Sequence, residues 1–370
     1  MKVRELIDRF EQFAPKTIVE PKDPVGLQLG SLDAEFHHVL VTLDVRPEVV
    51  QEAIDLGADL IFSHHPVMFR PAKNLDLSDP QNQMYADILA HHITVYSAHT
   101  NLDSADGGMN DWLAEALKLS DTTGLWDGVV DPQYMLTVRV QPMYADAVRL
   151  AMVGAGAGEL DRYAGASFEW NGTTWYTPLE GADPELGPVG ERNHVDELSI
   201  QTRVQGNQLS KITQAVTEVY PGGHPSLEVT PLKNGGHQYS MGRIGSLAQP
   251  MTVRAFAEYC KDVFQVSGLR LIAGDQEKQV QRVAVLGGDG GKFFKLAQAK
   301  GADIYVTGDV YYHTGHDMIA AGLPVVDPGH HIESICKPKL AELFGKWRSD
   351  NHWEFDITAS QLNTDPFTFI

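Results

Sequence analysis

Two stretches far apart in the sequence carry the same order of strand and helix signals, and this repeat constrains the fold more than any other feature. Residues 37–66 read "HHVLVTLDVRPEVVQEAIDLGADLIFSHHP", a pattern of strand, helix and strand, and residues 282–310 follow the same pattern. A constant offset aligns the two stretches without a gap and places the triplet Gly-Ala-Asp at 57–59 on the one at 301–303. The repeat predicts an α/β core built from two duplicated units.

The segment between the two units, residues 129–235, differs from them in pattern. It reads as strand, helix, a hairpin turning at Asn171-Gly172, strand, helix and strand. This order predicts a ferredoxin-like α+β module inserted into a discontinuous core of residues 1–128 and 236–370. The Gly- and Pro-rich stretches "PGGHPS" and "KNGGHQ" are expected to form a turn and the exit linker of the module.

Composition and charge exclude several classes of protein. The 370 residues are 43% hydrophobic, no apolar run is long enough to cross a bilayer, and the amphipathic start "MKVRELIDRFEQFA" does not resemble a signal peptide. A formal charge of −20 argues against a nucleic-acid surface, because phosphate contacts need clustered Lys and Arg. Two cysteines give neither a disulfide framework nor zinc-finger spacing. We therefore expect a cytoplasmic protein without membrane or nucleic-acid contacts.

Polar motifs follow three of the expected strands at the points where those strands end. The motifs come after strands 60–62, 94–97 and 324–327, and their residues are His64, His65, Asp103, His330 and Glu333. Open α/β sheets bind ligands beyond the carboxyl ends of their strands. A single His or Asp at such a place is most often a hydrogen-bonded structural residue or a helix cap. Here, however, three motifs follow equivalent strand ends in the two repeated units, and together they predict one shared site.

The residue types of this site indicate divalent metal ions. Three imidazoles and two carboxylates are too few to enclose two ions, but they suffice for two open sites completed by water. Nitrogen and oxygen ligands without thiolate suit Zn, Fe or Mn, and a shared carboxylate would hold two ions about 3.5–4 Å apart. His99, Asp309 and His313 lie near the same crevice and are expected to contact ligands or substrate, with His99 and Asp309 as candidates for proton transfer.

A glycine-rich stretch, "LGGDGGKFF" at residues 286–294, invites comparison with a phosphate-binding loop. It lacks the full spacing, because Gly287 and Gly291-Lys292 are one residue too close, and Phe293 replaces the Ser or Thr. Two interpretations stay open. The glycines either offer backbone N–H groups to an anion or form a turn that lets the following helix pack closely.

Five motifs, taken together and in order, resemble a known family. They are "DPVGLQLG" (23–30), "SHHP" (63–66), "HTNLD" (99–103), "TGDVYYH" (307–313) and "DPGHHIE" (327–333). As a set they are similar to the GTP cyclohydrolase 1 type 2 homologues, also called the NIF-three-like family, over nearly the whole chain. The resemblance implies a toroidal homohexamer and a PII/CutA-like insertion, whose best match is "GAGELDRYAGASF". It also implies a dinuclear metal site formed by His64, His65, Asp103, His330 and Glu333.

The chain departs from the family pattern at three places. The family usually has Asn where this chain has Pro24. The usual "HPYEEP" segment of the insertion reads "GHPSLEV" here, which weakens any ligand role of the insertion but leaves the core site intact. A second histidine, His331, follows His330, so the metal ligand at this place is one of the two.

Two functions of different classes agree with these features. The first is a metal-dependent hydrolase in which a metal-activated water attacks a small-molecule or nucleotide-like ligand. The cyclohydrolase name comes from the resemblance alone and does not define a substrate. The second is a non-catalytic metal-binding protein for regulation or metal delivery, with the PII-like insertion as its sensor. A buried pocket with open metal positions favours the enzyme, whereas an exposed site without a substrate groove favours the binding protein.

Overall fold

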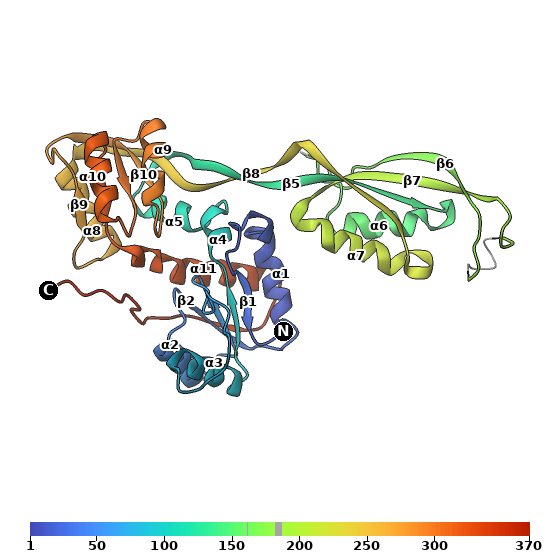
Figure 1. Ribbon diagram of the computed structural model, residues 1–370, viewed down its shortest axis with the longest axis horizontal. Coiled ribbons are helices and arrows are strands. Elements are labelled where there is room, and N and C mark those ends of the chain that lie inside the picture. The colour runs from blue at the N-terminus through green and yellow to red at the C-terminus, as the bar shows by residue number, and fades with distance from the viewer. Residues whose placement is uncertain (161, 182–186) are drawn as a thin grey trace. The chain divides into compact units, whose positions relative to one another are not determined.

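The computed structural model describes residues 1–160, 162–181 and 187–370. Asp161, within the stretch that resembles the family's insertion, lies outside the described residues. The chain has a mixed α/β fold with an α+β insertion, as the sequence predicts (Figure 1). No helix in the described part of the chain is both long and apolar enough to cross a membrane.

The chain forms two compact units, one of residues 1–129 with 238–370 and the other of residues 130–237. The larger unit contains two α/β lobes. The first lobe has a five-stranded sheet in the order β1-β4-β3-β2-β13. Its strands are β1 (Gly26–Leu29), β2 (His38–Thr42), β3 (Leu60–Ser63), β4 (Thr94–Ser97) and β13 (Asp356–Ala359). Its helical segments are α1 (Val3–Phe13), η1 (Lys16–Ile18), α2 (Pro47–Leu56), α3 (Pro80–Ala90), α4 (Thr100–Ser104) and α5 (Met109–Ala116).

The second lobe contains the other copy of the repeated unit. Its strands are β9 (Arg270–Ile272), β10 (Gln279–Val285), β11 (Ile304–Val306), β12 (Val325–Asp327) and the end of β8 (Ser226–Thr252). Its helical segments are α8 (Val253–Phe264), η6 (Gly291–Phe293), α9 (Phe294–Ala299), α10 (Tyr312–Ala321) and η7 (His330–Ile335). Helix α11 (Cys336–Asp350) follows η7 and packs against β2 and β13 of the first lobe. Strands β10, β11 and β12 are parallel neighbours, as β2, β3 and β4 are in the first lobe.

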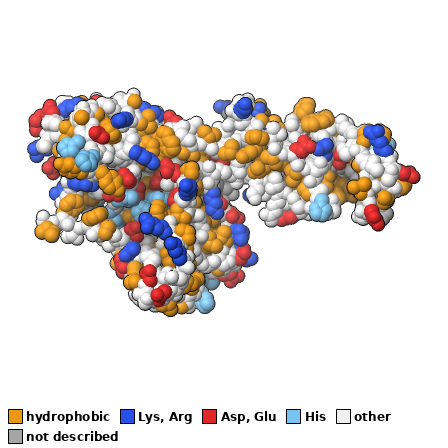
Figure 2. Space-filling view, viewed as in Figure 1, with side chains coloured by type: hydrophobic (Ala, Val, Ile, Leu, Met, Phe, Trp, Pro, Cys, Tyr) orange, Lys and Arg blue, Asp and Glu red, His pale blue; other side chains and the backbone are white. Residues whose placement is uncertain are grey.

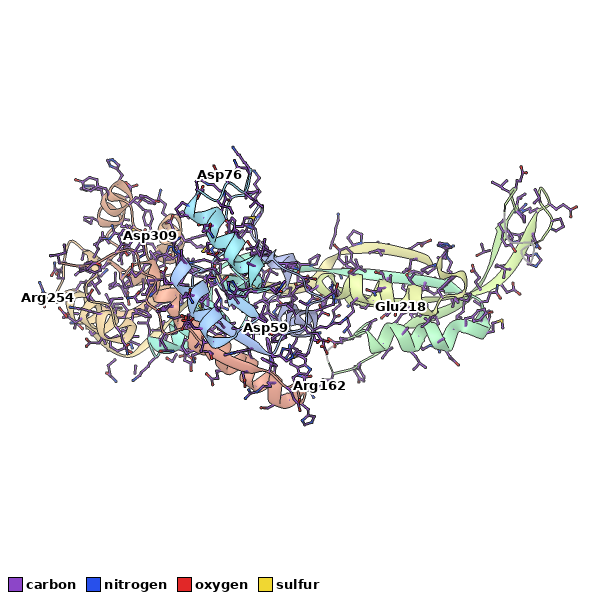
Figure 3. The ribbon with its side chains drawn as sticks, turned by 90° about the horizontal axis from the view of Figure 1, so that it is seen from below. Asp59, Asp76, Arg162, Glu218, Arg254 and Asp309 are labelled. Atoms are coloured by element: carbon purple, nitrogen blue, oxygen red, sulfur yellow. The ribbon has the colours of Figure 1, made fainter. Side chains whose placement is uncertain are left out.

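The repeated Gly-Ala-Asp triplet performs the same structural task in both lobes. In the first lobe the Asp59 carboxylate accepts the backbone N–H groups of His37 and His38, at the start of β2. Figure 3 labels Asp59 in this lobe. In the second lobe the Asp303 carboxylate accepts the backbone N–H groups of Gln281 and Arg282, within β10. The predicted duplication is therefore confirmed at the level of individual hydrogen bonds.

One apolar core joins the two lobes of the larger unit. Phe62 of β3 packs edge-on against Phe10 of α1 and Phe344 of α11, with ring centroids 4.8 and 4.9 Å apart. Val283 of β10 and Ile304 of β11 are fully buried in the same cluster. Because interiors are close-packed, this shared core fixes the two sheets relative to each other and thereby the side chains at their edges.

The smaller unit follows a β-α-β-β-α-β order. Its elements are β5 (Ser120–Val140), η2 (Pro142–Tyr144), α6 (Ala145–Gly154), β6 (Phe168–Tyr176), β7 (Asn193–Gln205), η4 (Gly206–Gln208), α7 (Leu209–Val219), η5 (Pro221–Gly223) and the first part of β8. The strand order β6-β7-β5-β8 is that of a ferredoxin-like sheet. Val138, Val148 and Ile212, from β5, α6 and α7, are fully buried between the sheet and its helices.

Two local predictions for this segment are wrong. Asn171-Gly172 is not a hairpin turn, because β6 continues through it and pairs Asn171 with Leu198 of β7. The stretch "KNGGHQ" is not a linker but part of β8, which lies beside β5 in the sheet. In both places hydrogen bonding to a neighbouring strand outweighs the local preference of Gly and Asn for turns.

Candidate metal centre

The five predicted ligand residues converge on one place in the larger unit. Together with His99, these residues form three groups whose nitrogen and oxygen atoms lie within 4.8 Å of one another: His64, His65 and His99; His65, His330 and Glu333; and His64, Asp103 and Glu333. Each side chain follows a strand at the carboxyl edge of its sheet, as the sequence predicts. Histidine side chains gather on this unit where its two lobes meet (Figure 2).

The His64 imidazole is buried and has a fixed orientation. Its Nδ1 donates a hydrogen bond to the backbone oxygen of Ala98, at 2.7 Å. This bond leaves Nε2 as the unprotonated nitrogen of the neutral ring, the state in which histidine binds a metal. Nε2 lies 3.5 Å from Oδ1 of Asp103 and 3.6 Å from Oε2 of Glu333.

Two further imidazoles are each held between an outer carboxylate and Glu333. Nδ1 of His65 lies 2.7 Å from Oδ1 of Asp44, and its Nε2 lies 3.1 Å from Oε2 of Glu333. Nδ1 of His330 lies 2.7 Å from Oδ2 of Asp309, and its Nε2 also lies 3.1 Å from Oε2 of Glu333. A carboxylate on Nδ1 is the arrangement that orients metal-binding histidines in proteins.

His99 adds a fourth imidazole to the cluster. Its ring centroid lies 5.2 Å from that of His64, and its Nδ1 lies 2.9 Å from Oδ1 of Asp23. Thr100, which follows it, donates its hydroxyl and its backbone N–H to the other oxygen of Asp23. His99 therefore has the same imidazole–carboxylate arrangement as His65, and its predicted role in proton transfer stays a prediction.

Two buried atoms at the centre show that the cluster fits a cation. Nε2 of His64 and Oδ1 of Asp103 have no hydrogen-bond partner among the described residues. Leaving such an atom unpaired costs about 1–3 kcal/mol, and more when it is charged. A divalent ion that accepts one lone pair from each atom removes this cost. The donor set of imidazole nitrogens and carboxylate oxygens suits such an ion.

The outer carboxylates raise the pKa values of two imidazoles. Burial lowers the pKa of His65, but hydrogen bonds to Asp44 and Glu333 outweigh it and raise the pKa to about 9. Burial likewise opposes the hydrogen bonds from His330 to Asp309 and Glu333, which raise its pKa to about 11. Both rings therefore hold a proton at neutral pH when no metal is bound, and a metal ion displaces that proton.

The two central carboxylates differ in their pKa values. Burial raises the pKa of Asp103 to about 6, against the attraction of His64. Burial also acts to raise the pKa of Glu333, but the imidazoles of His330, His64 and His65 outweigh it and hold that pKa well below its usual range. Glu333 is thus the permanent negative charge of the cluster, in contact with three imidazoles.

Two residues of the site were not predicted. Asp44 comes directly after β2, at the same sheet edge as the predicted ligands, so the strand-end argument applied to β2 would have found it. Asp23 belongs to the motif "DPVGLQLG", which the resemblance quotes without a role for this residue. Of the two adjacent histidines, His330 contacts Glu333 and belongs to one of the three groups, which favours His330 over His331 as the ligand.

The glycine-rich stretch 286–294 makes room for Glu333. A Cβ atom on Gly287 would lie 2.7 Å from Oε1 of Glu333, and one on Gly288 would lie 2.9 Å from it. The backbone N–H of Gly287 donates to Oδ1 of Asn110, whose amide in turn donates to the backbone oxygen of Asp103. These contacts involve Glu333 and Asn110 and not the helix that follows the glycines, so both interpretations of the stretch stay predictions.

Replacing Gly287 with Ala should therefore weaken metal binding. The added methyl group displaces the Glu333 carboxylate, so we expect a loss of affinity of about 10–100-fold, typical of changes next to metal ligands. Competition with a chromophoric zinc chelator measures this loss. Gly345→Ala is the matched control, because a Cβ there meets nothing within 4 Å. Equal affinities of the two variants would contradict the role of Gly287.

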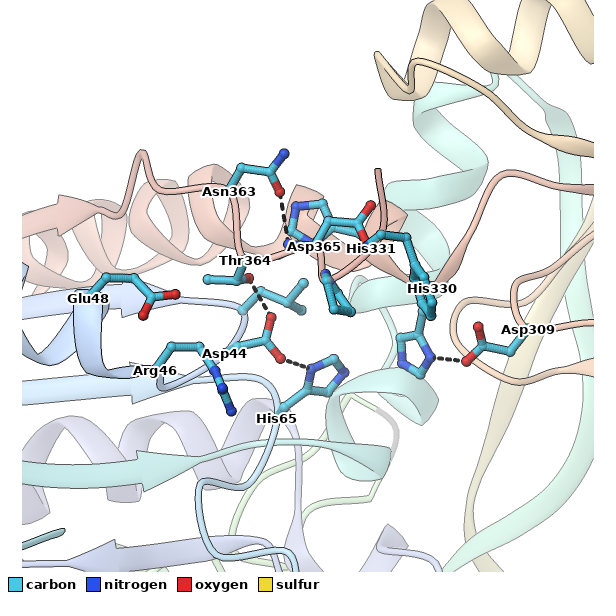
Figure 4. A pocket seen from close by; sticks show the side chains of 13 residues that line it. Asp44, Arg46, Glu48, His65, Asp309, His330, His331, Asn363, Thr364 and Asp365 are labelled. Atoms are coloured by element: carbon cyan, nitrogen blue, oxygen red, sulfur yellow. Dashed lines mark hydrogen bonds and ion pairs between the residues drawn. The ribbon is translucent and has the colours of Figure 1, made fainter. Parts of the chain in front are cut away.

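A cavity of about 540 Å³ adjoins the cluster (Figure 4). It lies between the lobes of the larger unit, with Asp44 and His65 on one side and Asp309 and His330 on the other. Most of its remaining wall is polar. The polar residues are Arg46, Glu48, His331, Asn363, Thr364 and Asp365, and the apolar ones are Leu43, Pro366 and Phe367. The volume is within the range of small-molecule sites.

Known proteins resemble this chain over its whole length. The model of the Duf34/NIF3 (NGG1p interacting factor 3) family matches residues 1–366. Proteins called GTP cyclohydrolase 1 type 2 homolog, from Bacillus subtilis and Halalkalibacterium halodurans, are each 40% identical and share 99% of this chain and 98% of their own. A crystal structure of a Bacillus cereus protein related to NIF3 is 38% identical, with a TM-score of 0.80 over 100% of this chain and 99% of its own. The chain therefore belongs to the Duf34/NIF3 family.

Proposed function

We propose that this protein binds two divalent metal ions and acts as a metal-dependent hydrolase on a small, nucleotide-like substrate. This proposal rests on two buried atoms, Nε2 of His64 and Oδ1 of Asp103, which have no hydrogen-bond partner in the part of the chain that the structure describes. They lie beside three further imidazoles and Glu333. Nitrogen and oxygen donors favour Zn, Fe or Mn. The ligands we assign are His64, His65, Asp103, His330 and Glu333.

The geometry supports a division of these ligands into two sets. His65, His330 and Glu333 would hold one ion, and His64 and Asp103 with Glu333 the other. Glu333 would be the shared ligand, because its Oε2 lies within 3.6 Å of one imidazole nitrogen each of His64, His65 and His330. Five protein groups around two ions leave positions for solvent or substrate, as catalytic rather than structural sites do.

The protein groups around the ions would orient ligands, bind substrate and transfer protons. When bound, paired divalent ions acidify water and polarise the bond under attack. Asp44 and Asp309 keep the Nε2 atoms of His65 and His330 directed at the centre. His99, whose Nδ1 contacts Asp23, would exchange a proton with a group in the cluster. The adjoining cavity would hold the remainder of the substrate.

Metal analysis followed by an activity screen tests the proposal. We expect about two divalent ions per chain, by analogy with other two-metal hydrolases, and metal-dependent turnover of a phosphoester, nucleotide or cyclic amide. His64→Ala should lose metal, whereas His91→Ala should not, since His91 is exposed at the end of α3. Full metal content without turnover would favour the metal-delivery or regulatory function. Absence of bound metal in the wild type would contradict both.

The family resemblance also supports a cytoplasmic homohexamer with residues 129–235 as a PII/CutA-like module. Light scattering measures the molar mass of the purified protein and so tests the hexamer. The mass of a monomer would contradict it. The separate compactness of residues 130–237 supports the module.

Deleting the insertion should leave a metal-binding core. The cut ends lie together, because the Gln238 side chain donates to the backbone oxygens of Asp127 and Val129. An Asn-Gly turn can therefore join Val129 to Gln238 as a hairpin. We expect a folded protein with the metal content of the wild type, measured by circular dichroism and mass spectrometry. An insoluble product, or a folded core without metal, would contradict a peripheral module.

A further inference from the structure

The chain segment that follows β13 leads directly to the metal cluster. Strand β13 pairs in parallel with β2, and Ala359 lies opposite Val41. The pairing continues for one more residue, since the Ser360 N–H donates to the oxygen of Val41 at 2.8 Å. Strands β2 and β13 thus end at the same carboxyl edge of the sheet. The polypeptide continues from β2 to Asp44, and from β13 to residues 361–367, which we call the strap.

The strap is attached to the first lobe at its start. The Ser360 hydroxyl donates to Glu52 of α2, and the Lys337 ammonium donates to the backbone oxygen of Leu362 at 2.8 Å. The Leu362 side chain packs against the buried apolar cluster of the first lobe, which includes Val49. These contacts hold the beginning of the strap against the lobe that carries His64 and His65.

One hydroxyl of the strap belongs to the hydrogen-bond chain that orients a predicted metal ligand. The Thr364 hydroxyl donates to Oδ2 of Asp44, while Oδ1 of the same carboxylate receives Nδ1 of His65 at 2.7 Å (Figure 4). Nε2 of His65 then lies 3.1 Å from Glu333. The chain Thr364–Asp44–His65–Glu333 therefore connects the strap to the centre of the cluster.

The rest of the strap forms a wall of the substrate cavity and reaches the second lobe. Asn363, Pro366 and Phe367 line the cavity beside His65 and His330. Just beyond the strap, the ring of Phe369 lies against Gly268, where an added Cβ would be 2.6 Å from the ring. The segment thus runs from the lobe that carries Asp44 to the lobe that carries Asp309.

We propose that the strap completes the substrate cavity and that Thr364 is a positioning residue, so that seating of the strap and binding of metal at His65 stabilise each other. This inference rests on the proposed metal site. The carboxylate on a metal-binding histidine commonly contributes about 10–100-fold to metal affinity. Thr364 is the second hydrogen-bond partner of that carboxylate. Thermodynamic linkage makes this effect reciprocal. If the seated strap strengthens metal binding, then bound metal stabilises the seated strap by the same free energy.

Replacing Thr364 with Val tests the positioning role with a matched control. The variant keeps the shape of the side chain and removes the hydroxyl, and we expect its zinc affinity to fall about 10-fold. Thr358→Val is the control, because the Thr358 hydroxyl bonds to His38, 2.8 Å away and outside the metal cluster. A chromophoric chelator measures both affinities. Zinc affinity of Thr364→Val equal to that of Thr358→Val would overturn the positioning role.

Hydrogen exchange of the strap tests the reciprocal effect without any assay of activity. In the wild type, zinc should slow the exchange of the backbone amides of residues 361–365 and 367 relative to the chelator-treated protein, and in Thr364→Val this protection should shrink. Wild-type protein that binds zinc without any change in exchange would overturn the strap proposal and leave the metal site standing. Wild-type protein that binds no zinc would overturn the metal site and the strap proposal together.

Discussion

Substituting Glu333 with Gln should lower the metal content of the purified protein from about two equivalents to below one, the largest loss for any single ligand. Glu333 is buried and its Oε2 lies 3.1 Å from the Nε2 atoms of both His65 and His330. The amide keeps the size of the side chain but removes the charge that both proposed ions share. Metal analysis after exhaustive dialysis measures the loss, and circular dichroism checks the fold.

Glu342→Gln is the control for this experiment, because Glu342 is an exposed residue of α11, close in sequence but outside the cluster. It should leave the metal content unchanged. If the Glu333 variant retained two ions with the fold intact, the assignment of Glu333 as the shared ligand would be wrong. If the variant failed to fold without metal but recovered in excess zinc, the assignment would stand, because metal binding would then contribute to folding.

The sequence predicted the framework of the site because the framework depends on local patterns. Strand signals mark where β3 and β4 end in the first sheet and where β12 ends in the second. In each sheet, parallel strands place their carboxyl ends along one edge. His64, Asp103 and Glu333 follow those ends, so their convergence required only that the two repeated units share a core. The shared core is visible in the structure as one buried apolar cluster that contains Phe62 of β3 and Val283 of β10.

The outer residues of the site could not be assigned from the sequence in the same way. Asp44 and Asp309 act through a hydrogen bond to one ring nitrogen of a histidine, and that bond depends on side-chain orientation. Asp309 was expected as a proton carrier, but its oxygen lies 2.7 Å from Nδ1 of His330, a position that suits orientation of the ring. Thr364 is still further from any motif, because it approaches Asp44 only through the pairing of β13 with β2.

The glycine residues show the limits of composition as a guide. Glycines at 235 and 236 predicted a linker and occur in a strand. Those at 287 and 288 left an anion site or a turn open, and they border a carboxylate. Glycine permits several backbone conformations, so in each case contacts with neighbouring residues decide the structure. For Gly287 that neighbour is Glu333, whose carboxylate occupies the space that a Cβ would need.

Substituting Asp103 with Asn should abolish hydrolysis to a greater extent than it lowers metal content. The Asp103 carboxylate is buried, and its Oδ1 lies 3.5 Å from Nε2 of His64 without a hydrogen-bond partner among the described residues. Asn keeps the shape of the side chain and removes its negative charge. Three imidazoles and Glu333 remain to hold metal, so we expect most of the metal to be retained while turnover falls by more than about 100-fold, beyond the usual effect of an outer residue.

The comparison of rate with metal content separates the two proposed functions. A hydrolase needs the charge of Asp103 at the reacting centre, so its rate depends on this residue more steeply than its metal affinity does. A metal-delivery protein needs the charge only for affinity. Any slow hydrolysis in its preparations would then be unchanged in Asp103→Asn. Turnover below about 10⁻² s⁻¹ on every substrate class, far under the usual enzyme range of about 1–10³ s⁻¹, would favour metal delivery or regulation. A rate that fell in strict proportion to metal content would assign Asp103 to metal retention alone.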